Sequence, residues 1–246
     1  MRYAILSDIH ANLEALTAVL ADADGEGAGA VLCLGDLVGY GADPVACLEA
    51  VAERAAGLVA GNHEYGTVGL VDLDWFNPVA RAAVLWTRGR LGADAGRYLA
   101  ALPLTLTVGD ACLVHASPSQ PEEWDYLMSA EDGFAVFPAF DTRLCFVGHS
   151  HRPGVWSVGS GGPEHADAFR AWPTRIRLED GRRYLINVGS VGQPRDRDPR
   201  AAYALWDQDR REVTIRRVDY DRRATADKIL AAGLPRILAT RLARGT

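Results

Sequence analysis

The residues best able to do chemistry in this 246-residue chain are histidines and carboxylates that come in short clusters. Histidine is scarce, yet five of the six histidines lie in polar motifs that follow apolar runs. The clusters, in chain order, are Asp8 with His10, Asp36 in LGDLVGYG, Asn62 with His63, His115 at the end of ACLVH, and His149 with His151. Imidazole and carboxylate together favour manganese, iron, zinc or nickel over magnesium. The pattern therefore predicts a site for transition-metal ions.

Two of the clusters have the same spacing. Asp8 and His10, like His149 and His151, are separated by one residue. Alternate side chains of an extended chain point the same way, so each pair is expected to face one site. For one histidine, a hydrogen-bonded position in the core or on the surface would be the simpler explanation. Five at corresponding strand ends, together with two aspartates and an asparagine, favour a shared site instead.

The first third of the chain predicts an alternating βαβαβ pattern that would position these clusters. Short apolar runs predict strands at 3–8, 30–36 and 57–62, and helical spacing predicts helices at 12–23 and 43–54. Such alternation implies a parallel sheet with right-handed connections. The polar motifs follow the strands, which is where open α/β sheets carry their sites.

The rest of the chain becomes rich in strands after a helical stretch. Its expected elements are two helices over 77–101, a hairpin over 105–117, a helix near 129–139, strands at 143–150, 154–158, 168–178, 183–188, 201–207 and 212–218, and a helix from about Asp221. The glycine-rich segment 159–165 is predicted to be a surface loop. Two sheets covered by helices accommodate both halves in a single domain spanning 1–246.

Composition sets the class of protein. Hydrophobic residues make up 48% and charged residues 24%, as in globular proteins. No apolar run reaches the roughly 18 residues of a membrane span, and the N-terminus lacks the features of a signal peptide. Four cysteines, none in a CxxC pair, are expected as buried thiols in a reducing cytoplasm.

The net charge of −6 conceals an asymmetry. Residues 1–169 carry 8 arginines against 22 acidic residues, whereas residues 170–246 carry 18 basic against 10 acidic residues. The basic part could bind phosphates. The favoured explanation is that its arginines and aspartates form exposed ion pairs.

Five motifs, in this order, resemble the calcineurin-like metallophosphoesterase superfamily. They are D-x-H at 8–10, GD-x2-GYG at 35–41, GNHE at 61–64, the strand-final His115 and GHSH at 148–151. The segment INVGSVGQPRD at 186–196 is similar to the closing loop of the small bacterial phosphodiesterase branch and of relatives that split diadenosine tetraphosphate. The resemblance implies an α/β (α+β) fold, a four-layer αββα sandwich of two mixed sheets flanked by helices.

The resemblance also implies a dinuclear centre of manganese, iron, zinc or nickel ions. One ion would be held by Asp8, His10 and His151, and the other by Asn62, His115 and His149, with Asp36 bridging. Two such ions can hold a bridging hydroxide that attacks phosphorus in line, which makes Asp36 a catalytic residue.

The expected substrate contacts come from Asn62, His63 and Arg195. His63 occupies the position that the family uses near the leaving group, where an imidazole could stabilise charge or donate a proton. His63 is therefore the second catalytic residue that the resemblance implies.

Three positions depart from the phosphoprotein phosphatases of the superfamily, which read GD-x-VDRG and RGNHE. Gly39 replaces the aspartate that would orient His63, and Tyr40 and Ala60 replace phosphate-gripping arginines. The loss of these clamps favours diesters or anhydrides over phosphomonoesters, although Arg195 could substitute. The prediction is a dimetal hydrolase of phosphodiesters or dinucleoside polyphosphates. The alternatives are a phosphomonoesterase or protein phosphatase of the same fold, and a binding scaffold like the retromer subunit that shares it.

The expected partner is a small phosphate-ester substrate, with no membrane contact and no stable nucleic-acid partner; homo-oligomers are compatible with the sequence. Glu64 is expected either beside the site or as an acid at a helix start, and Asn12 as a helix cap. The stretches 64–78 and 117–128 carry aromatic residues that either bind a base or cover the site, or pack the loops onto the body: Trp75, Phe76, Trp124 and Tyr126.

Overall fold

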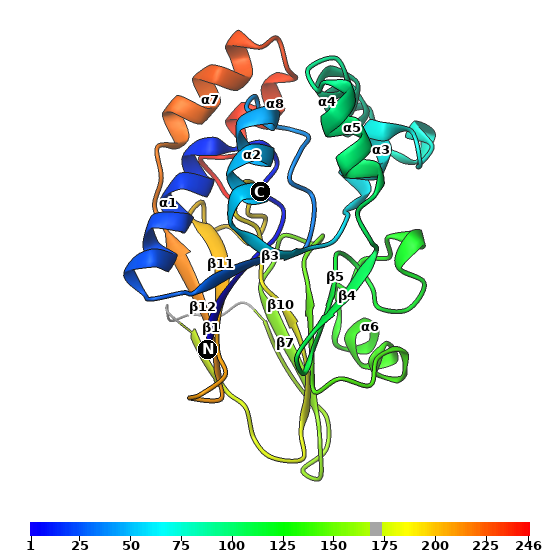
Figure 1. The fold of residues 1–246 in the computed structure, drawn as a ribbon, viewed down its shortest axis with the longest axis vertical. Coiled ribbons are helices and arrows are strands. Elements are labelled where there is room, and N and C mark those ends of the chain that lie inside the picture. Colours follow the sequence, from blue (N-terminus) through cyan, green and yellow to red (C-terminus); the bar gives the residue numbers. More distant parts are fainter. Residues whose placement is uncertain (168–173) are drawn as a thin grey trace.

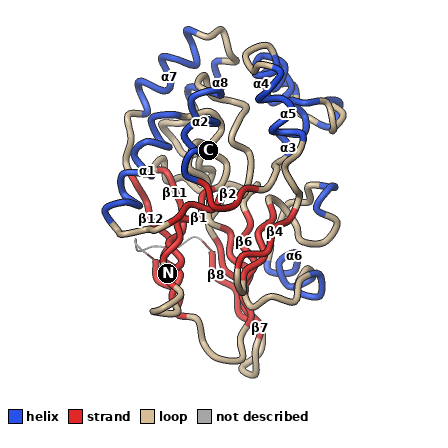
Figure 2. The backbone as a smooth tube through the Cα atoms, viewed as in Figure 1, coloured by secondary structure: helices blue, strands red, loops and turns tan. Residues whose placement is uncertain are grey.

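Two mixed sheets of six strands, packed face to face, form the centre of the molecule (Figures 1 and 2). The computed structural model describes residues 1–167 and 174–246. The first sheet has the order β3-β2-β1-β11-β12-β9. Its strands are β1 (Arg2–Leu6), β2 (Ala30–Cys33), β3 (Ala55–Leu58), β9 (Thr174–Arg177), β11 (Ala201–Asp207) and β12 (Glu212–Val218). Strands β1, β2 and β3 run parallel, which confirms the predicted βαβαβ unit.

The second sheet has the order β4-β5-β6-β10-β7-β8. Its strands are β4 (Thr105–Val108), β5 (Ala111–Val114), β6 (Leu144–Val147), β7 (Gly154–Val158), β8 (Glu164–Asp167) and β10 (Arg183–Asn187). Strands β5, β6 and β10 are parallel neighbours, while β4, β7 and β8 pair antiparallel. In each sheet three neighbouring strands therefore run parallel, so that their carboxyl ends lie at the same edge of the sheet.

Helices α1 (Leu13–Gly25) and α2 (Pro44–Arg54) pack on the outer face of the first sheet, and α6 (Ala130–Ala135) packs on that of the second, which completes four layers (Figure 1). The other helices are α3 (Asn62–Val68), α4 (Pro78–Arg88), α5 (Ala93–Ala100), α7 (Arg222–Ala231) and α8 (Arg236–Thr240), with 3-10 turns η1 (Leu73–Trp75), η2 (Pro121–Glu123) and η3 (Phe137–Ala139). Residues of α4, α7 and α8 share a separate apolar cluster with Tyr40. Asn12 caps α1 as expected, since its side chain accepts a hydrogen bond from the Ala15 N–H.

Alternation along the strands separates the apolar cores. In β1, Ala4 and Leu6 face α1 and α2, whereas Tyr3 and Ile5 face the other sheet. A third core lies between the second sheet and α6, where Phe137 packs with the outward residues of β6 and β10. This layering confirms the αββα sandwich.

Several predicted boundaries are wrong. The strand expected at 57–62 is β3, Ala55–Leu58, because the chain turns after it toward α3. The segment 159–165 is not all loop, since β8 begins at Glu164 and His165 stacks on Trp156. The predicted start of α2 is right, since Asp43 occupies its N-cap position; the Asp43 carboxylate makes no cap bond there and accepts from Lys228 Nζ at 2.8 Å. Residues 168–173 of the strand expected at 168–178 lie outside the described residues.

Ion pairs account for much of the basic C-terminal part. Arg216 pairs with Asp22 on α1, and Arg217 pairs with Asp196. These contacts support the ion-pair explanation of the charge asymmetry. The four cysteines are free thiols. In the described part of the chain, no helix is both long and apolar enough to cross a membrane.

Candidate metal centre

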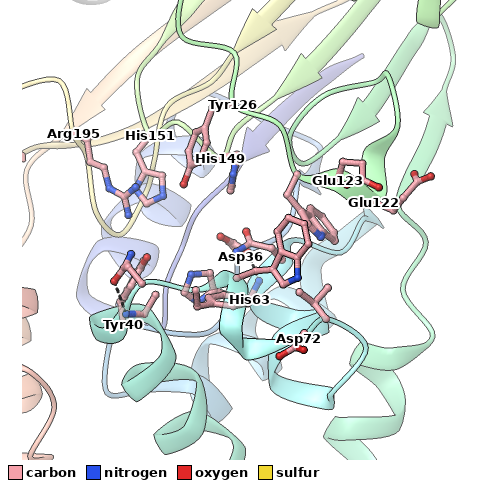
Figure 3. Close-up of a pocket in the computed structure, with 17 residues that line it drawn as sticks. Asp36, Tyr40, His63, Asp72, Glu122, Glu123, Tyr126, His149, His151 and Arg195 are labelled. Carbon is pink, nitrogen blue, oxygen red and sulfur yellow. Dashed lines mark hydrogen bonds between the residues drawn. The ribbon is translucent and has the colours of Figure 1, made fainter.

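The predicted motifs meet at one edge of the two sheets. Asp8 and His10 follow β1, and Asp36 follows β2. Asn62 and His63 begin α3, after β3. From the second sheet, His115 follows β5, and His149 and His151 follow β6. The structure thus brings together the seven predicted ligands and His63. Figure 3 shows four of these residues, Asp36, His63, His149 and His151, around one cavity with Arg195 nearby.

The backbone at these residues is unusual. Asp8, His10, Asp36, His149 and His151 all have left-handed conformations, with φ between 49° and 62°. The pairs at spacing two therefore converge through left-handed turns, and the prediction that they converge through an extended chain is wrong. Non-glycine residues adopt this region infrequently, and such outliers cluster at functional sites.

One group of ligand-type atoms contains Asp8, His10 and His151. His10 Nε2 and His151 Nε2 lie 3.2 Å apart, and Asp8 Oδ1 lies 3.2 Å from His151 Nε2. The other ring nitrogens are occupied, because His10 Nδ1 lies 3.1 Å from the Val38 carbonyl and His151 Nδ1 lies 2.5 Å from the Gln193 carbonyl. Donation to those carbonyls fixes the tautomer and leaves both Nε2 lone pairs facing each other.

A second group contains Asp36, His115 and His149. His115 Nδ1 is 2.9 Å from the Leu34 carbonyl, and its Nε2 lies 3.1 Å from His149 Nδ1. Asp36 Oδ2 is 3.3 Å from His115 Nε2 and 3.6 Å from His10 Nε2. Asp36 therefore lies between the two groups, and Asp8 Oδ1 also comes within 4.0 Å of His115 Nε2.

The chemistry of these atoms fits bound cations. Within the described residues, Asp8 Oδ1 and Asn62 Oδ1 are buried acceptors without a hydrogen-bond partner. Burial lowers the pKa of His149 to about 3, which keeps its ring neutral. Although burial acts to lower the pKa of His115, the Asp36 and Asp8 carboxylates raise it to about 9. Unpaired acceptors beside carboxylates that attract positive charge are the expected surroundings of metal ions.

Glu64 holds the loop that carries Asp36. Its Oε2 accepts the N–H groups of Asp36 at 2.7 Å and Gly61 at 2.8 Å, and its Oε1 accepts that of Val38 at 3.2 Å. Glu64 is thus both a helix-start acid and a residue beside the site, which were the two roles that the sequence left open.

The ring of His63 is positioned by aromatic neighbours, and a carboxylate contacts only its backbone N–H. Its backbone N–H donates to Asp36 Oδ1 at 2.9 Å, and its ring lies against Tyr40 and Phe76, with ring centres 4.5 and 5.4 Å away. In the described part of the chain, its buried Nδ1 has no partner. That atom faces Gly39 (φ +83°), where an added Cβ would overlap it and lie 3.0 Å from the ring atoms Cε1 and Cγ. Aromatic packing replaces the aspartate of the phosphoprotein phosphatases, and burial lowers the pKa of His63 to about 4.

A cavity of about 420 Å³ opens over the centre (Figure 3). Its lining residues are Asp36, Tyr40, Asn62, His63, Val71, Asp72, Trp75, Phe76, Asn77, Ala80, Glu122, Glu123, Trp124, Tyr126, His149, His151 and Arg195. The aromatics of 64–78 and 117–128 therefore line the cavity, and three of them also contact histidines: Phe76 contacts His63, Tyr126 contacts His149, and Trp124 contacts His115.

Arg195 is held by a contact that the sequence did not predict. Its guanidinium donates to Gln193 Oε1 at 2.9 Å, and Arg241, just after α8, donates to the same oxygen at 2.9 Å. Gln193 also supplies the carbonyl that contacts His151. The C-terminal helix thus supports the closing loop. Arg241 was not predicted from the sequence, because it lies 46 positions from Arg195 and no motif around it indicates a contact with the closing loop.

A two-sheet sandwich whose strand ends carry buried histidine, aspartate and asparagine ligands is the architecture of the metallophosphoesterases. The Calcineurin-like phosphoesterase superfamily domain matches residues 1–211, and the chain belongs to this superfamily. The resemblance seen in the motifs is thereby confirmed.

Three relatives extend over almost the whole chain. An uncharacterised protein of Methanocaldococcus jannaschii is 40% identical over 248 residues, which cover 98% of this chain and 97% of that protein. A metallophosphoesterase from Sphaerobacter thermophilus is 43% identical, with a TM-score of 0.86 and coverage of 100% of this chain and 99% of that one. A hypothetical protein from Pyrococcus horikoshii OT3 is 22% identical, with a TM-score of 0.79 and coverage of 100% and 98%, and supports the fold alone.

Proposed function

We propose that the protein is a dimetal phosphodiesterase that hydrolyses phosphodiester or dinucleoside polyphosphate bonds. The observation that carries the proposal is the buried centre itself. The Nε2 lone pairs of His10 and His151 face one another at 3.2 Å, and Asp8 and Asn62 present buried acceptors without partners in the described residues. Such an arrangement is costly unless cations fill it.

The proposed ligand sets follow the two groups. Asp8, His10 and His151 would hold one divalent transition-metal ion. When bound, two such ions supply Lewis acidity and an activated oxygen nucleophile at neutral pH.

The second set has three ligands besides the shared carboxylate: Asn62, His115 and His149. Asp36 would be shared by both sets, because its carboxylate lies within 3.6 Å of a histidine nitrogen from each group. Manganese, iron, zinc and nickel all suit these donors.

The remaining residues bind and orient the substrate. Arg195 lies at one end of the cavity and supplies a cation for a non-bridging phosphate oxygen (Figure 3). His63 lies beside Asp36 and can hold a proton near the leaving oxygen. Tyr126, Trp75 and Trp124 line the cavity.

Preference for diesters over monoesters follows from the missing clamps. Tyr40 and Ala60 stand where phosphoprotein phosphatases have arginines, so the dianion of a monoester would have fewer cationic contacts. The second candidate function, a phosphomonoesterase, is favoured by one observation: Arg195 lines the cavity, where it can supply one of those contacts.

The test compares kcat/KM for bis-p-nitrophenyl phosphate and p-nitrophenyl phosphate at one pH with Mn²⁺, alongside elemental analysis of metal per chain. We expect about two ions per chain and faster hydrolysis of the diester. A clear monoester preference that disappears in Arg195→Ala would support the monoesterase. Absence of metal and of hydrolysis would support a binding scaffold.

We further propose a cytoplasmic setting and a small phosphate ester as the partner. All four cysteines are free thiols, which suits a reducing compartment. The cavity volume matches that of small-molecule sites.

A further inference from the structure

The cavity over the metal centre is electrically asymmetric. Arg195 lies at one end, whereas Asp72, Glu122 and Glu123 lie at the opposite end (Figure 3). Among the described residues that line the cavity, Arg195 is the only arginine or lysine. A ligand that spans the cavity therefore meets positive charge at one end and negative charge at the other.

The acidic end is not neutralised by the protein. Considering residues 1–167 and 174–246, none of the three carboxylates forms an ion pair, although Asp72 accepts the Asp74 N–H at 2.9 Å. Their neighbours Asp74 and Arg81 pair with each other instead. Unpaired carboxylates at a cavity wall disfavour any substituent that brings further negative charge.

The same end carries an exposed indole. Trp75 is 80% exposed, the largest exposure among the large hydrophobic side chains of the described residues. It ends the 3-10 turn η1, which Asp72 caps. Trp124 directly follows the turn η2, and its buried Nε1 has no hydrogen-bond partner within the described chain. Both tryptophans, each close in sequence to the acidic residues, line the same cavity.

Tryptophan faces beside unpaired carboxylates are the chemistry that binds an organic ammonium group. A cation over an indole is attracted to the face of the ring, and nearby carboxylates add Coulomb attraction. An uncharged group would gain only the aromatic contact, and a phosphate chain would be repelled.

We propose that the preferred substrate is a phosphodiester in which one ester substituent carries an organic ammonium group, bound by Trp75, Glu122 and Glu123. The proposal rests on the phosphodiesterase function proposed above and deepens it. The phosphoryl group lies over the centre toward Arg195, and the ammonium group lies toward the tryptophans. Dinucleoside polyphosphates, whose extra phosphates would approach the acidic end, become the less favoured substrates.

The test uses two esters that differ in one atom. p-Nitrophenyl phosphorylcholine carries a quaternary nitrogen, and p-nitrophenyl 3,3-dimethylbutyl phosphate carries carbon in its place, so both shape and leaving group are matched. With the metal-loaded protein we expect kcat/KM to be about 10-fold higher for the choline ester, which corresponds to about 1.4 kcal/mol. The preference should shrink as salt rises.

Three variants locate the effect. Glu122→Gln with Glu123→Gln, and separately Trp75→Leu, should reduce the preference to about 2-fold or less while bis-p-nitrophenyl phosphate is still hydrolysed. Glu49→Gln with Glu53→Gln likewise removes two charges, from exposed positions on α2 that do not line the cavity, and should keep the full preference.

A second readout does not depend on turnover. Choline should quench or shift the tryptophan fluorescence of the metal-loaded protein, and 3,3-dimethylbutanol should have a much smaller effect. Diester hydrolysis without preference for the choline ester, or a preference that survives in Trp75→Leu and the double variant, would overturn the proposal. Failure to hydrolyse any diester while choline still binds would instead refute the proposed catalytic function.

Discussion

Replacing Gly39 with alanine should displace His63 and slow catalysis. Gly39 has φ +83°, and a Cβ there would overlap His63 Nδ1 and lie 3.0 Å from two further ring atoms. Ordinary contacts begin near 3.4 Å, so the ring must move by at least several tenths of an ångström. It cannot move freely, because Tyr40 and Phe76 pack on it. Catalytic groups tolerate displacements of about 0.5 Å, so we expect kcat to fall about 10- to 100-fold.

Gly69 provides a matched control for the backbone cost. It has φ +84°, at the C-cap of α3, and a Cβ there meets nothing within 4 Å. Gly39→Ala and Gly69→Ala therefore share the penalty of about 1–2 kcal/mol for a left-handed alanine, or roughly 2–8 °C in Tm. Only Gly39→Ala disturbs the imidazole.

The assay measures kcat and KM for bis-p-nitrophenyl phosphate in the two variants and the unmodified protein, together with their thermal unfolding. We expect kcat to fall in Gly39→Ala and to stay within about 3-fold of the unmodified value in Gly69→Ala. Equal kcat values in all three proteins would show that the position of the His63 ring does not limit catalysis.

Three other predictions concern the centre and its support. Asp36→Asn should lower kcat/KM at least about 100-fold, because its carboxylate lies between the two groups, whereas His165→Ala should change it little; comparable losses in two folded variants would refute the site assignment. Arg241→Ala should raise KM for bis-p-nitrophenyl phosphate about 5- to 10-fold with little change in kcat, since it loosens Gln193 and through it Arg195, and Arg241→Lys should recover part of the loss; an unchanged KM would show that Arg195 needs no such support. Removing bound metal with a chelator should lower Tm by about 5–10 °C, measured by calorimetry, because ions at 100 times their dissociation constant stabilise the fold by about 2.7 kcal/mol; an unchanged Tm in protein shown to have lost its metal would contradict this linkage.

The metal centre was predictable because strand ends on one edge of a sheet must lie close together. Asp8, Asp36 and His149 each follow a buried apolar run, so their order along the chain was enough to bring them together. The left-handed backbone at these residues was not predictable, since it depends on contacts between loops, such as Asp8 Oδ2 with the His149 N–H at 3.0 Å.

Long-range contacts account for what the sequence did not predict. The absence of an aspartate at Gly39 was visible, but the packing of Phe76 on His63 requires the loop before α4 to fold over the site. Arg241 reaches Gln193 only through the packing of α8. The ends of β3 were misplaced and β8 was missed, because short apolar or glycine-rich segments do not mark where strand pairing starts or stops.

The strand order of the first sheet also has a consequence for synthesis on the ribosome. Strand β1 pairs with β2 on one side, but its other neighbour is β11, with Arg2 opposite Asp207. A growing chain therefore cannot complete this sheet until more than 200 residues have emerged, and β1 exposes one pairing edge until then. Pairings between such distant segments slow folding, so the early βαβαβ unit must remain without β11 on the second edge of β1 while the rest of the chain is made.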